Sequence, residues 1–256
     1  MFKSTIVIGA GAGFATRFYS TKNGFSFNSK YWQDHKRSLP DLPSNLYEIA
    51  VGCLLGDACL YRVSKDTKIK FEQGYMHEEY LFSLFDLFKL YTFHEKPYTR
   101  LEIRGDRKGQ VKSYSFRTFT HTTFNRLWDL FIIDGKKSIR PGLITNHLTD
   151  IGLTYWIMDD GSLQNDKKSL ILHTQSYDKA GVEILASELN SKFKLNSRVI
   201  PHKVKYHVIF IPSSDAKLLY DLISPHIHSS MKYKLPVIDK LAGAPLLEYI
   251  IIELMT

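Results

Sequence analysis

A pattern of three features occurs twice in this chain of 256 residues, and the repeat restricts the possible folds more than any other property of the sequence. Each copy begins with an apolar stretch that ends in an acidic residue, at 50–58 and 153–161. A helix-like stretch follows later in each copy, and after it comes a lysine close to a proline, at 137–141 and 234–236. The same order in both places predicts two halves built on one plan.

The apolar stretch of the first copy is predicted to be a helix. Residues 47–56 contain no proline and have an apolar face, and Gly52 and Gly56 lie four residues apart on one side. Small residues there would let a partner helix approach closely. The second copy has Tyr155, Trp156 and Met158 in this region, which predicts that the two helices pack asymmetrically.

Between these features, apolar and charged residues alternate as they do in half-buried strands. In residues 99–104, Leu101 and Ile103 fall on one side and the charged residues on the other. The predicted strands are 99–104 and 113–117 in the first half and 170–175 and 203–210 in the second. The predicted helices over their apolar faces are 79–90, 122–131, 180–193 and 216–223. This pattern favours an α+β fold with antiparallel sheets whose other faces are polar and basic.

The composition favours a polyanionic partner. Lys and Arg total 34 against 26 Asp and Glu, which gives a net charge of +8, and basic surfaces bind nucleic acids by neutralising phosphates and releasing counterions. No apolar run approaches the roughly 18–20 residues that a membrane span needs, so no membrane partner is expected. On a single strand, alternating basic residues can simply keep a sheet soluble, but their recurrence in both halves favours a nucleic-acid groove. The candidate binding residues are Lys68, Lys70, Arg100, Arg104, Arg117, Gln175, Lys203 and Lys205.

The first 33 residues contain no acidic residue but several basic and hydroxyl ones, a composition typical of a mitochondrial presequence. Residues 17–20 resemble a matrix-protease site, so residues 1–19 are predicted to be a presequence and the protein to lie in the mitochondrial matrix. Residues 20–43 are a predicted linker, and the two halves are predicted to cover 44–145 and 146–256. Residues 6–13 also resemble the start of a dinucleotide-binding turn, but Phe14 stands where that motif has its third glycine.

Two strings, 155–161 and 231–236, make the interpretation specific. Together with residues 50–58, they resemble the paired LAGLIDADG motifs of homing endonucleases and intron maturases, most of all the single-chain, two-motif enzymes of yeast mitochondrial group I introns. The resemblance covers roughly residues 45–236. It implies two pseudo-symmetric halves of αββαββα type, with the motif helices packed at the centre and two saddle-shaped antiparallel sheets forming a nucleic-acid groove. It also implies a monomer that cleaves double-stranded DNA at a specific site with Mg²⁺ or Mn²⁺.

The last acidic residue of each motif, Asp57 and Asp160, is the strongest candidate for a catalytic and metal-binding role. A carboxylate at the carboxyl end of a helix faces the negative end of the helix dipole, at a cost of about 0.3–1 kcal/mol. If the helices pair, the two carboxylates also repel each other. A divalent cation would relieve both effects, because Mg²⁺ prefers carboxylate, water and phosphate oxygens. Gly56 and Asp159 are further candidate metal ligands; the competing interpretation of each aspartate is a solvated helix cap.

By the resemblance, Lys137 and Lys234 correspond to lysines near the two active sites, where a lysine can order water or stabilise phosphate charge. The plain alternative is that they are ordinary phosphate-contacting or solvated lysines. Gln73 and Gln175 are candidates for positioning water.

Two functions are compatible with these residues. The first is a site-specific DNA endonuclease. The second is a maturase, an RNA-binding splicing cofactor for a group I intron. The predicted presequence favours the second, because a protein imported into the organelle no longer propagates its own gene by cutting an intron site. The intact Asp57, Asp160, Lys137 and Lys234 favour the first.

Overall fold

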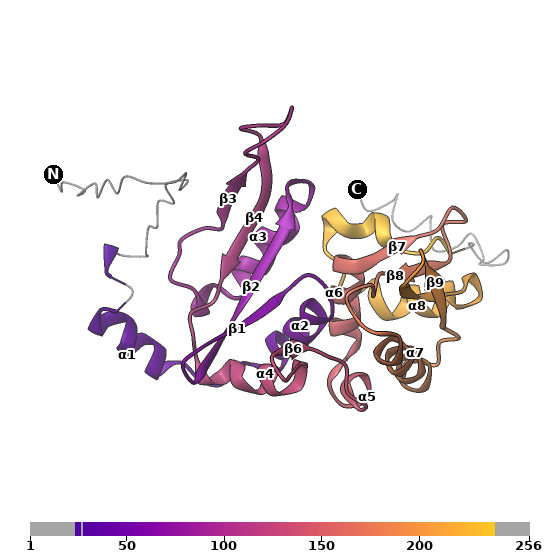
Figure 1. Cartoon of the computed structure of the whole chain (residues 1–256), viewed down its shortest axis with the longest axis horizontal. Helices are drawn as coiled ribbons and strands as arrows, with labels where there is room; N and C mark the ends of the chain where they lie inside the picture. Colours follow the sequence, from indigo (N-terminus) through magenta and orange to yellow (C-terminus); the bar gives the residue numbers. More distant parts are fainter. Residues whose placement is uncertain (1–23, 27, 239–256) are drawn as a thin grey trace, which may run out of the picture.

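The computed structural model describes residues 24–26 and 28–238, and within them the same order of elements occurs twice (Figure 1). The first half contains α2 (Ser44–Leu55), β1 (Cys59–Val63), β2 (Asp66–Gly74), α3 (Glu78–Leu87), β3 (Tyr98–Leu101), β4 (Val111–Arg117) and α4 (Asn125–Phe131). The second contains α6 (Asp150–Asp160), β7 (Gly161–Leu163), β8 (Leu170–Leu172), α7 (Lys179–Phe193), β9 (Arg198–His202), β10 (Tyr206–Ile211) and α8 (Ala216–Ile223). Both halves therefore have the αββαββα order that the resemblance implied, and they share one plan as the repeat predicted.

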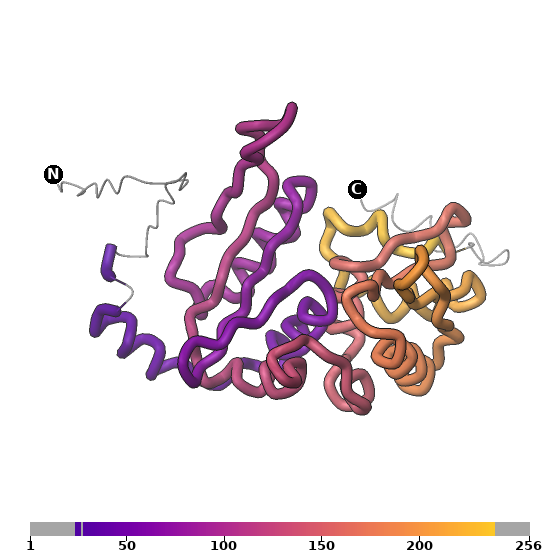
Figure 2. Tube along the Cα trace, in the orientation of Figure 1, coloured from indigo at the N-terminus to yellow at the C-terminus, as the bar shows by residue number. Residues whose placement is uncertain are grey.

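Each half has one four-stranded antiparallel sheet, and the two sheets have the same topology. The strand order is β1-β2-β4-β3 in the first and β7-β8-β10-β9 in the second. The sheets lie on opposite sides of the central helices, the first purple and magenta and the second orange (Figure 2). The fold is thus α+β with two pseudo-symmetric halves.

Strand β2 shows why the sequence forms a sheet with two different faces. Its residues alternate between buried and partly exposed positions, so Ile69 and Phe71 enter the core while Lys68 and Lys70 stay on the open side. The Phe71 ring stacks on Phe116 of β4 at 4.7 Å. Burying a side chain of this size contributes about 1.5–3 kcal/mol.

Helices α2 and α6 lie side by side at the centre of the molecule (Figure 1). They are so close that a Cβ atom at Gly52 would lie 2.1 Å from the carbonyl oxygen of Gly152. A Cβ atom at Gly152 would in turn lie 3.0 Å from the carbonyl oxygen of Glu48. The second motif helix thus has a small residue at the contact, Gly152, which lies one position before the repeated segment 153–161.

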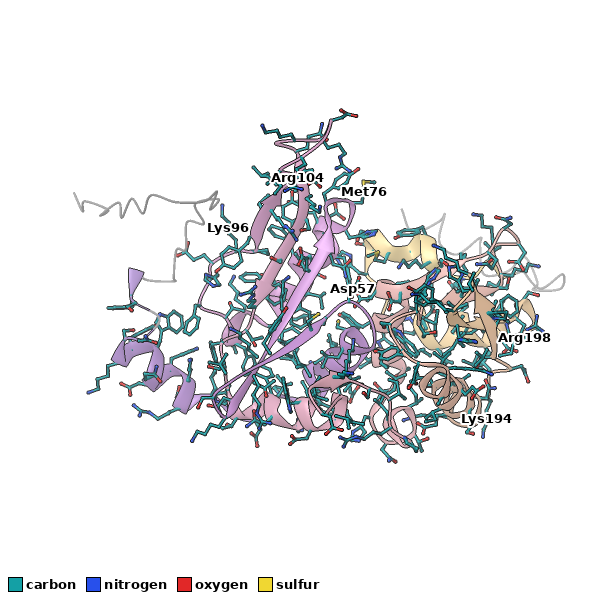
Figure 3. The ribbon with its side chains drawn as sticks, in the orientation of Figure 1. Asp57, Met76, Lys96, Arg104, Lys194 and Arg198 are labelled. Carbon is teal, nitrogen blue, oxygen red and sulfur yellow. The ribbon has the colours of Figure 1, made fainter. Side chains whose placement is uncertain are left out.

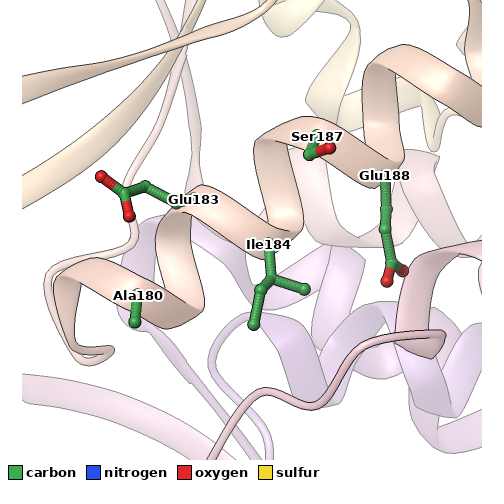
Figure 4. A pocket seen from close by; sticks show the side chains of 5 residues that line it. All are labelled: Ala180, Glu183, Ile184, Ser187 and Glu188. Atoms are coloured by element: carbon green, nitrogen blue, oxygen red, sulfur yellow. The ribbon is translucent and has the colours of Figure 1, made fainter.

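A short hairpin and helix connect the halves. They are β5 (Ile132–Ile133), β6 (Lys136–Lys137) and α5 (Leu143–His147). Glu188 of α7 accepts hydrogen bonds from the backbone N–H groups of Gly142, Ile144 and Thr145, and so holds the start of α5. Figure 4 shows Glu188 at one end of a shallow depression on α7, whose other lining residues are Ala180, Glu183, Ile184 and Ser187. None of the predicted site residues lines this depression.

The segment predicted to be a linker contains an additional helix, α1 (Lys30–Ser38). Its Trp32 is buried and meets Phe93 edge to face at 5.1 Å. The presequence prediction falls on residues outside the described ranges. Among the helices that the structure describes, none combines the length and the apolar character needed to cross a membrane.

Two strand predictions need correction. Strand β3 ends at Leu101, where its pairing with β4 shifts register, and Leu101 and Ile103 are 50% and 68% exposed rather than facing the core. The predicted strand 203–210 begins only at Tyr206, because Lys203 has a φ of 55° and lies with Lys205 in the turn between β9 and β10. The alternation of polar and apolar residues continues through this turn, so the sequence pattern did not indicate that the chain reverses there. The sequence also did not reveal β1, β2, β7 and β9.

Candidate active site at the ends of the paired helices

The two motif aspartates lie at the carboxyl ends of the paired helices, at the junction of the two halves. Asp57 follows Gly56, the residue that caps α2, and is exposed; Figure 3 labels it between the two sheets. Asp160 is the last residue of α6 and is partly buried. Because α2 and α6 pack against each other, the two aspartates lie near enough for the charge of Asp57 to act on Asp160.

Asp160 is in an environment that disfavours its charge. Burial raises the pKa of its carboxyl group to about 7, with a further contribution from the negative charge of Asp57. Lys137 and Lys234 oppose this shift. A carboxylate in such surroundings is a group whose charged form a cation would stabilise.

The two lysines lie at the carboxyl ends of the motif helices. The Nζ atom of Lys234 donates to the carbonyl oxygens of Ile157 (3.2 Å), Met158 and Asp159 (3.2 Å). The Nζ atom of Lys137 donates to the carbonyl oxygen of Gly56 at 3.2 Å. Each ammonium group thus donates to carbonyl oxygens at the carboxyl end of a motif helix, which is the negative end of the helix dipole.

Burial lowers the pKa of both lysines, whereas the motif carboxylates raise it. The structure therefore brings both predicted lysines to the site. Their contacts there are to backbone carbonyl oxygens, and a contact to phosphate stays a prediction.

Tyr177, between β8 and α7, reaches across from the second half to the end of α2. Its hydroxyl group donates to the carbonyl oxygens of Leu55 (3.0 Å) and Leu54 (3.5 Å). The Nζ atom of Lys137 lies 5.5 Å from the centre of the Tyr177 ring, at cation–π distance. No sequence signal marked this tyrosine, because its hydrogen bonds join residues 122 and 123 positions apart.

Gln73 connects the two motifs. Its Nε2 atom donates to Oδ2 of Asp57 and to Oδ1 of Asp159, both at 3.0 Å. The Tyr80 hydroxyl group also donates to Oδ1 of Asp159, at 2.9 Å. Burial, with the charge of Asp57, raises the pKa of Asp159 well above its usual range. Gln73 was a candidate for positioning water, whereas Tyr80 resembled an ordinary core residue of a helix.

Three of the predicted nucleic-acid-binding residues come together on the open face of the first sheet. Lys70 of β2 lies directly across from Arg117 of β4, and burial together with the charge of Arg117 lowers the pKa of Lys68. Adjacent like charges are unfavourable, so this group is suited to a polyanion. Arg100, also on this sheet, is 3.4 Å from Glu72, which is paired with Lys70 as well.

The remaining predicted binding residues lie off the sheet faces. Arg104 is in the β3–β4 connection, at the far end of the first half (Figure 3), and Lys203 and Lys205 are in the β9–β10 turn. Gln175 follows β8, and its Nε2 atom is 3.1 Å from Nδ1 of His173. The structure does not bring Gln175 into contact with either motif aspartate.

The oxygen atoms at the site fit a hard divalent cation, because the Asp57 and Asp160 carboxylates and the Gly56 carbonyl are the ligand types that Mg²⁺ and Mn²⁺ accept. Among the described residues, no three His, Cys, Asp or Glu side chains form a metal-binding group. Water and phosphate oxygens are the further ligands that such an ion accepts.

Comparison with known proteins agrees with this geometry. Residues 47–219 match the model of the LAGLIDADG DNA endonuclease family, and this range includes most of α2, all of α6 and all strands of the two sheets. This chain belongs to that family. The LAGLIDADG motifs are thus the helices α2 and α6 with the aspartates that end them.

Individual relatives extend the match over most of the chain. The probable intron-encoded endonuclease 1 of Wickerhamomyces canadensis is 34% identical over 217 residues, which are 83% of this chain and 93% of the relative. The cytochrome b mRNA maturase bI2 of Saccharomyces cerevisiae is 29% identical over 85% of this chain and 54% of its own length. The structure of the homing endonuclease I-WcaI bound to its DNA recognition sequence superposes with a TM-score of 0.78 at 33% identity, over 85% of this chain and 97% of that one.

Proposed function

We propose that this protein is a site-specific DNA endonuclease of the homing type, with Asp57 and Asp160 at the two cleavage sites. The observation that supports it most is the pairing of α2 and α6, which brings both carboxylates to one place between two sheets. The similarity to I-WcaI, whose structure contains its DNA target, supports the same activity.

The residues at the helix ends would hold divalent cations, either Mg²⁺ or Mn²⁺. The chain would supply as ligands the carboxylates of Asp57 and Asp160 and the carbonyl of Gly56. The fourth candidate ligand, Asp159, has both carboxylate oxygens in hydrogen bonds within the protein. A bound ion would polarise the scissile phosphate and stabilise the charge that develops on its oxygens. Gln73 holds the Asp57 carboxylate at 3.0 Å. Lys137, which makes one carbonyl contact, would stabilise phosphate charge.

The open face of the first sheet would hold the duplex. Lys68, Lys70 and Arg117 would contact phosphates and set the position of the protein on the DNA. Because one chain contains two related but different halves, a monomer can bind an asymmetric target without forming a dimer. Lys203 and Lys205, in a turn at the end of the second sheet, would extend these contacts.

A second candidate function is a maturase that binds a group I intron RNA. The similarity to the cytochrome b mRNA maturase bI2 favours it, and the same basic faces can contact RNA phosphates. The name of that relative and the basic, acid-free residues 1–33 also support a location in mitochondria.

Cleavage of a selected target separates the two functions. A library of random duplexes is incubated with the protein and Mg²⁺, and the cleaved ends are sequenced. We expect one recognition sequence to be enriched, and we expect its double-strand cleavage to be lost in Asp57→Asn and Asp160→Asn. Asp221→Asn is a matched control, because Asp221 is an exposed residue of α8 paired with Lys217. If no sequence is cut while group I intron RNA is bound tightly, the endonuclease proposal is wrong and the maturase is favoured.

A further inference from the structure

The residues directly before the two motif aspartates differ, and the difference is built into the packing. Gly56 precedes Asp57, and Asp159 precedes Asp160. A Cβ atom at Gly56 would lie 2.5 Å from Cβ and 2.8 Å from Oδ2 of Asp159. The missing side chain at position 56 therefore leaves the space that the Asp159 carboxylate fills.

The Asp159 carboxylate holds the first half of the site through three hydrogen bonds. Its Oδ2 atom accepts from the backbone N–H of Asp57 at 3.2 Å. Its Oδ1 atom accepts from the Tyr80 hydroxyl group and from Nε2 of Gln73, and Gln73 also donates to the Asp57 carboxylate. Asp159, from the second half, thus fixes the main chain of Asp57 directly and its side chain through Gln73.

Asp160 has no such support. In the registers of β1–β2 and β7–β8, the residue that corresponds to Gln73 is Thr174, whose hydroxyl group donates to the backbone carbonyl of His207. Across residues 24–26 and 28–238, no side-chain or backbone donor makes a hydrogen bond to the Asp160 carboxylate. The two aspartates are therefore related by the repeat but are held differently.

We propose that Asp159 is a positioning residue that fixes Asp57 and Gln73, and that the two DNA strands are consequently cleaved at unequal rates. The inference rests on the proposed endonuclease function. A carboxylate already held in place loses less freedom on reaching the reactive arrangement than one that is not. The strand that Asp57 serves is thus cut first, and a duplex nicked in one strand accumulates.

Asp159→Asn tests the inference with a change of one atom. The amide oxygen can still accept from Tyr80 and Gln73, but the amide nitrogen then faces the N–H of Asp57, which is also a donor. The contact to the Asp57 main chain is lost while the size of the side chain is kept. Tyr80→Phe is the second variant: it removes one hydrogen bond to Asp159 and leaves the buried ring.

The assay uses the selected target with a different label on the 5′ end of each strand, so that both cleavage rates are measured in one reaction. Binding of the same duplex is measured in parallel with Ca²⁺. For Asp159→Asn we expect the faster strand to slow by about 10- to 100-fold, as small displacements of reacting groups can cause. The slower strand and the binding should change much less than this, and Tyr80→Phe should act in the same direction but more weakly. Asp221→Asn should leave both rates unchanged.

Equal slowing of both strands, or no change in either, in a folded Asp159→Asn variant overturns the inference and leaves the endonuclease proposal intact. If Asp159→Asn does not fold, the ratio of the two strand rates in Tyr80→Phe decides by the same criterion. Equal strand rates in the unaltered protein also overturn the inference. If the unaltered protein cuts no duplex at all, the proposed function itself is wrong, and the inference fails with it.

Discussion

Replacing Gly52 with alanine tests whether the close contact of α2 and α6 defines the site. The added Cβ atom would lie 2.1 Å from the carbonyl oxygen of Gly152, 2.8 Å from its carbonyl carbon and 3.0 Å from its Cα. Ordinary contacts between carbon and oxygen are about 3.3 Å or longer. All three obstacles are backbone atoms, so no side-chain rotation relieves the clash, and the helices must separate by about 1 Å.

The size of the effect follows from two opposing contributions. Overpacking of a tight core costs about 1–3 kcal/mol, sometimes more, and here the strain falls on a contact between two backbones. Alanine in a helix interior gains back about 1 kcal/mol over glycine. We expect Gly52→Ala to lower the free energy of unfolding by about 2 kcal/mol, which in a protein of this length lowers the Tm by about 4–8 °C.

Gly152→Ala is the matched control. Its Cβ atom would meet mainly the Cδ1 atom of Leu148 at 2.8 Å, the end of a flexible side chain, and the Glu48 carbonyl oxygen at 3.0 Å. We expect a net effect of less than about 1 kcal/mol, because helix propensity offsets the milder clash. Thermal unfolding of the three proteins measures both effects. A Gly52→Ala variant as stable as the unaltered protein would contradict the packing argument.

Two further perturbations address the charged groups of the site. The pKa of Asp160 is about 7 in the folded state against an ordinary value of 3.8, so the folded state binds the proton more tightly and loses stability as the pH rises through this range. In the absence of divalent cations, Asp160→Asn should therefore be more stable than the unaltered protein at pH 8, by about 1–2 kcal/mol after discounting for the partial exposure of Asp160. Thermal unfolding measures this difference, which should disappear near pH 4. A stability gain of the same size at both pH values would exclude the Asp160 charge as its source. Lys234→Met removes hydrogen bonds to three carbonyl oxygens and should destabilise the fold by about 2–3 kcal/mol, whereas Lys137→Met removes one and should cost about 1 kcal/mol. If Lys137 acts on phosphate, Lys137→Met should nevertheless lose cleavage, and full cleavage by a folded Lys137→Met protein would rule that role out.

The repeat predicted two related halves because its copies lie about 100 residues apart in the sequence and so relate distant parts of the structure. Two copies of a motif, each followed by a helix and a lysine, allow few arrangements other than two related halves, and the two sheets indeed have the same strand order. The paired aspartates followed from the same pattern. The details of the strands did not, because the alternation of residues 203–210 continues through a turn that only the backbone of Lys203 reveals.

The contacts that hold the site could not be predicted from single positions. Tyr80 lies on an amphipathic helix, where an aromatic residue is ordinarily part of the core, and it is indeed fully buried. Its hydroxyl group matters because Asp159 arrives from a helix 79 residues further along the chain. Tyr177 has the same character, since its partners at the end of α2 come from the other half. The role of such a tyrosine depends on which residue of the other half contacts its hydroxyl group, and a single sequence does not show this contact.

Two physical effects could favour a metal ion at this site: the helix dipole and the repulsion between the two carboxylates. From the sequence, an aspartate at the carboxyl end of a helix conflicts with the helix dipole. In the folded protein, Lys137, Tyr177 and Lys234 already donate to the terminal carbonyl oxygens of both motif helices. The dipole is therefore largely compensated without any ion.

Two effects on Asp160 are not compensated: its burial and its repulsion by the Asp57 carboxylate. Together they keep the pKa of Asp160 near 7 despite the two nearby lysines. The lysines are held on carbonyl oxygens, so they neutralise the helix ends more than they pair with the carboxylates. A divalent cation held by these carboxylates would reduce this remaining unfavourable contribution directly. The case for a divalent ion thus rests on the pair of carboxylates and not on the position of each aspartate at a helix end.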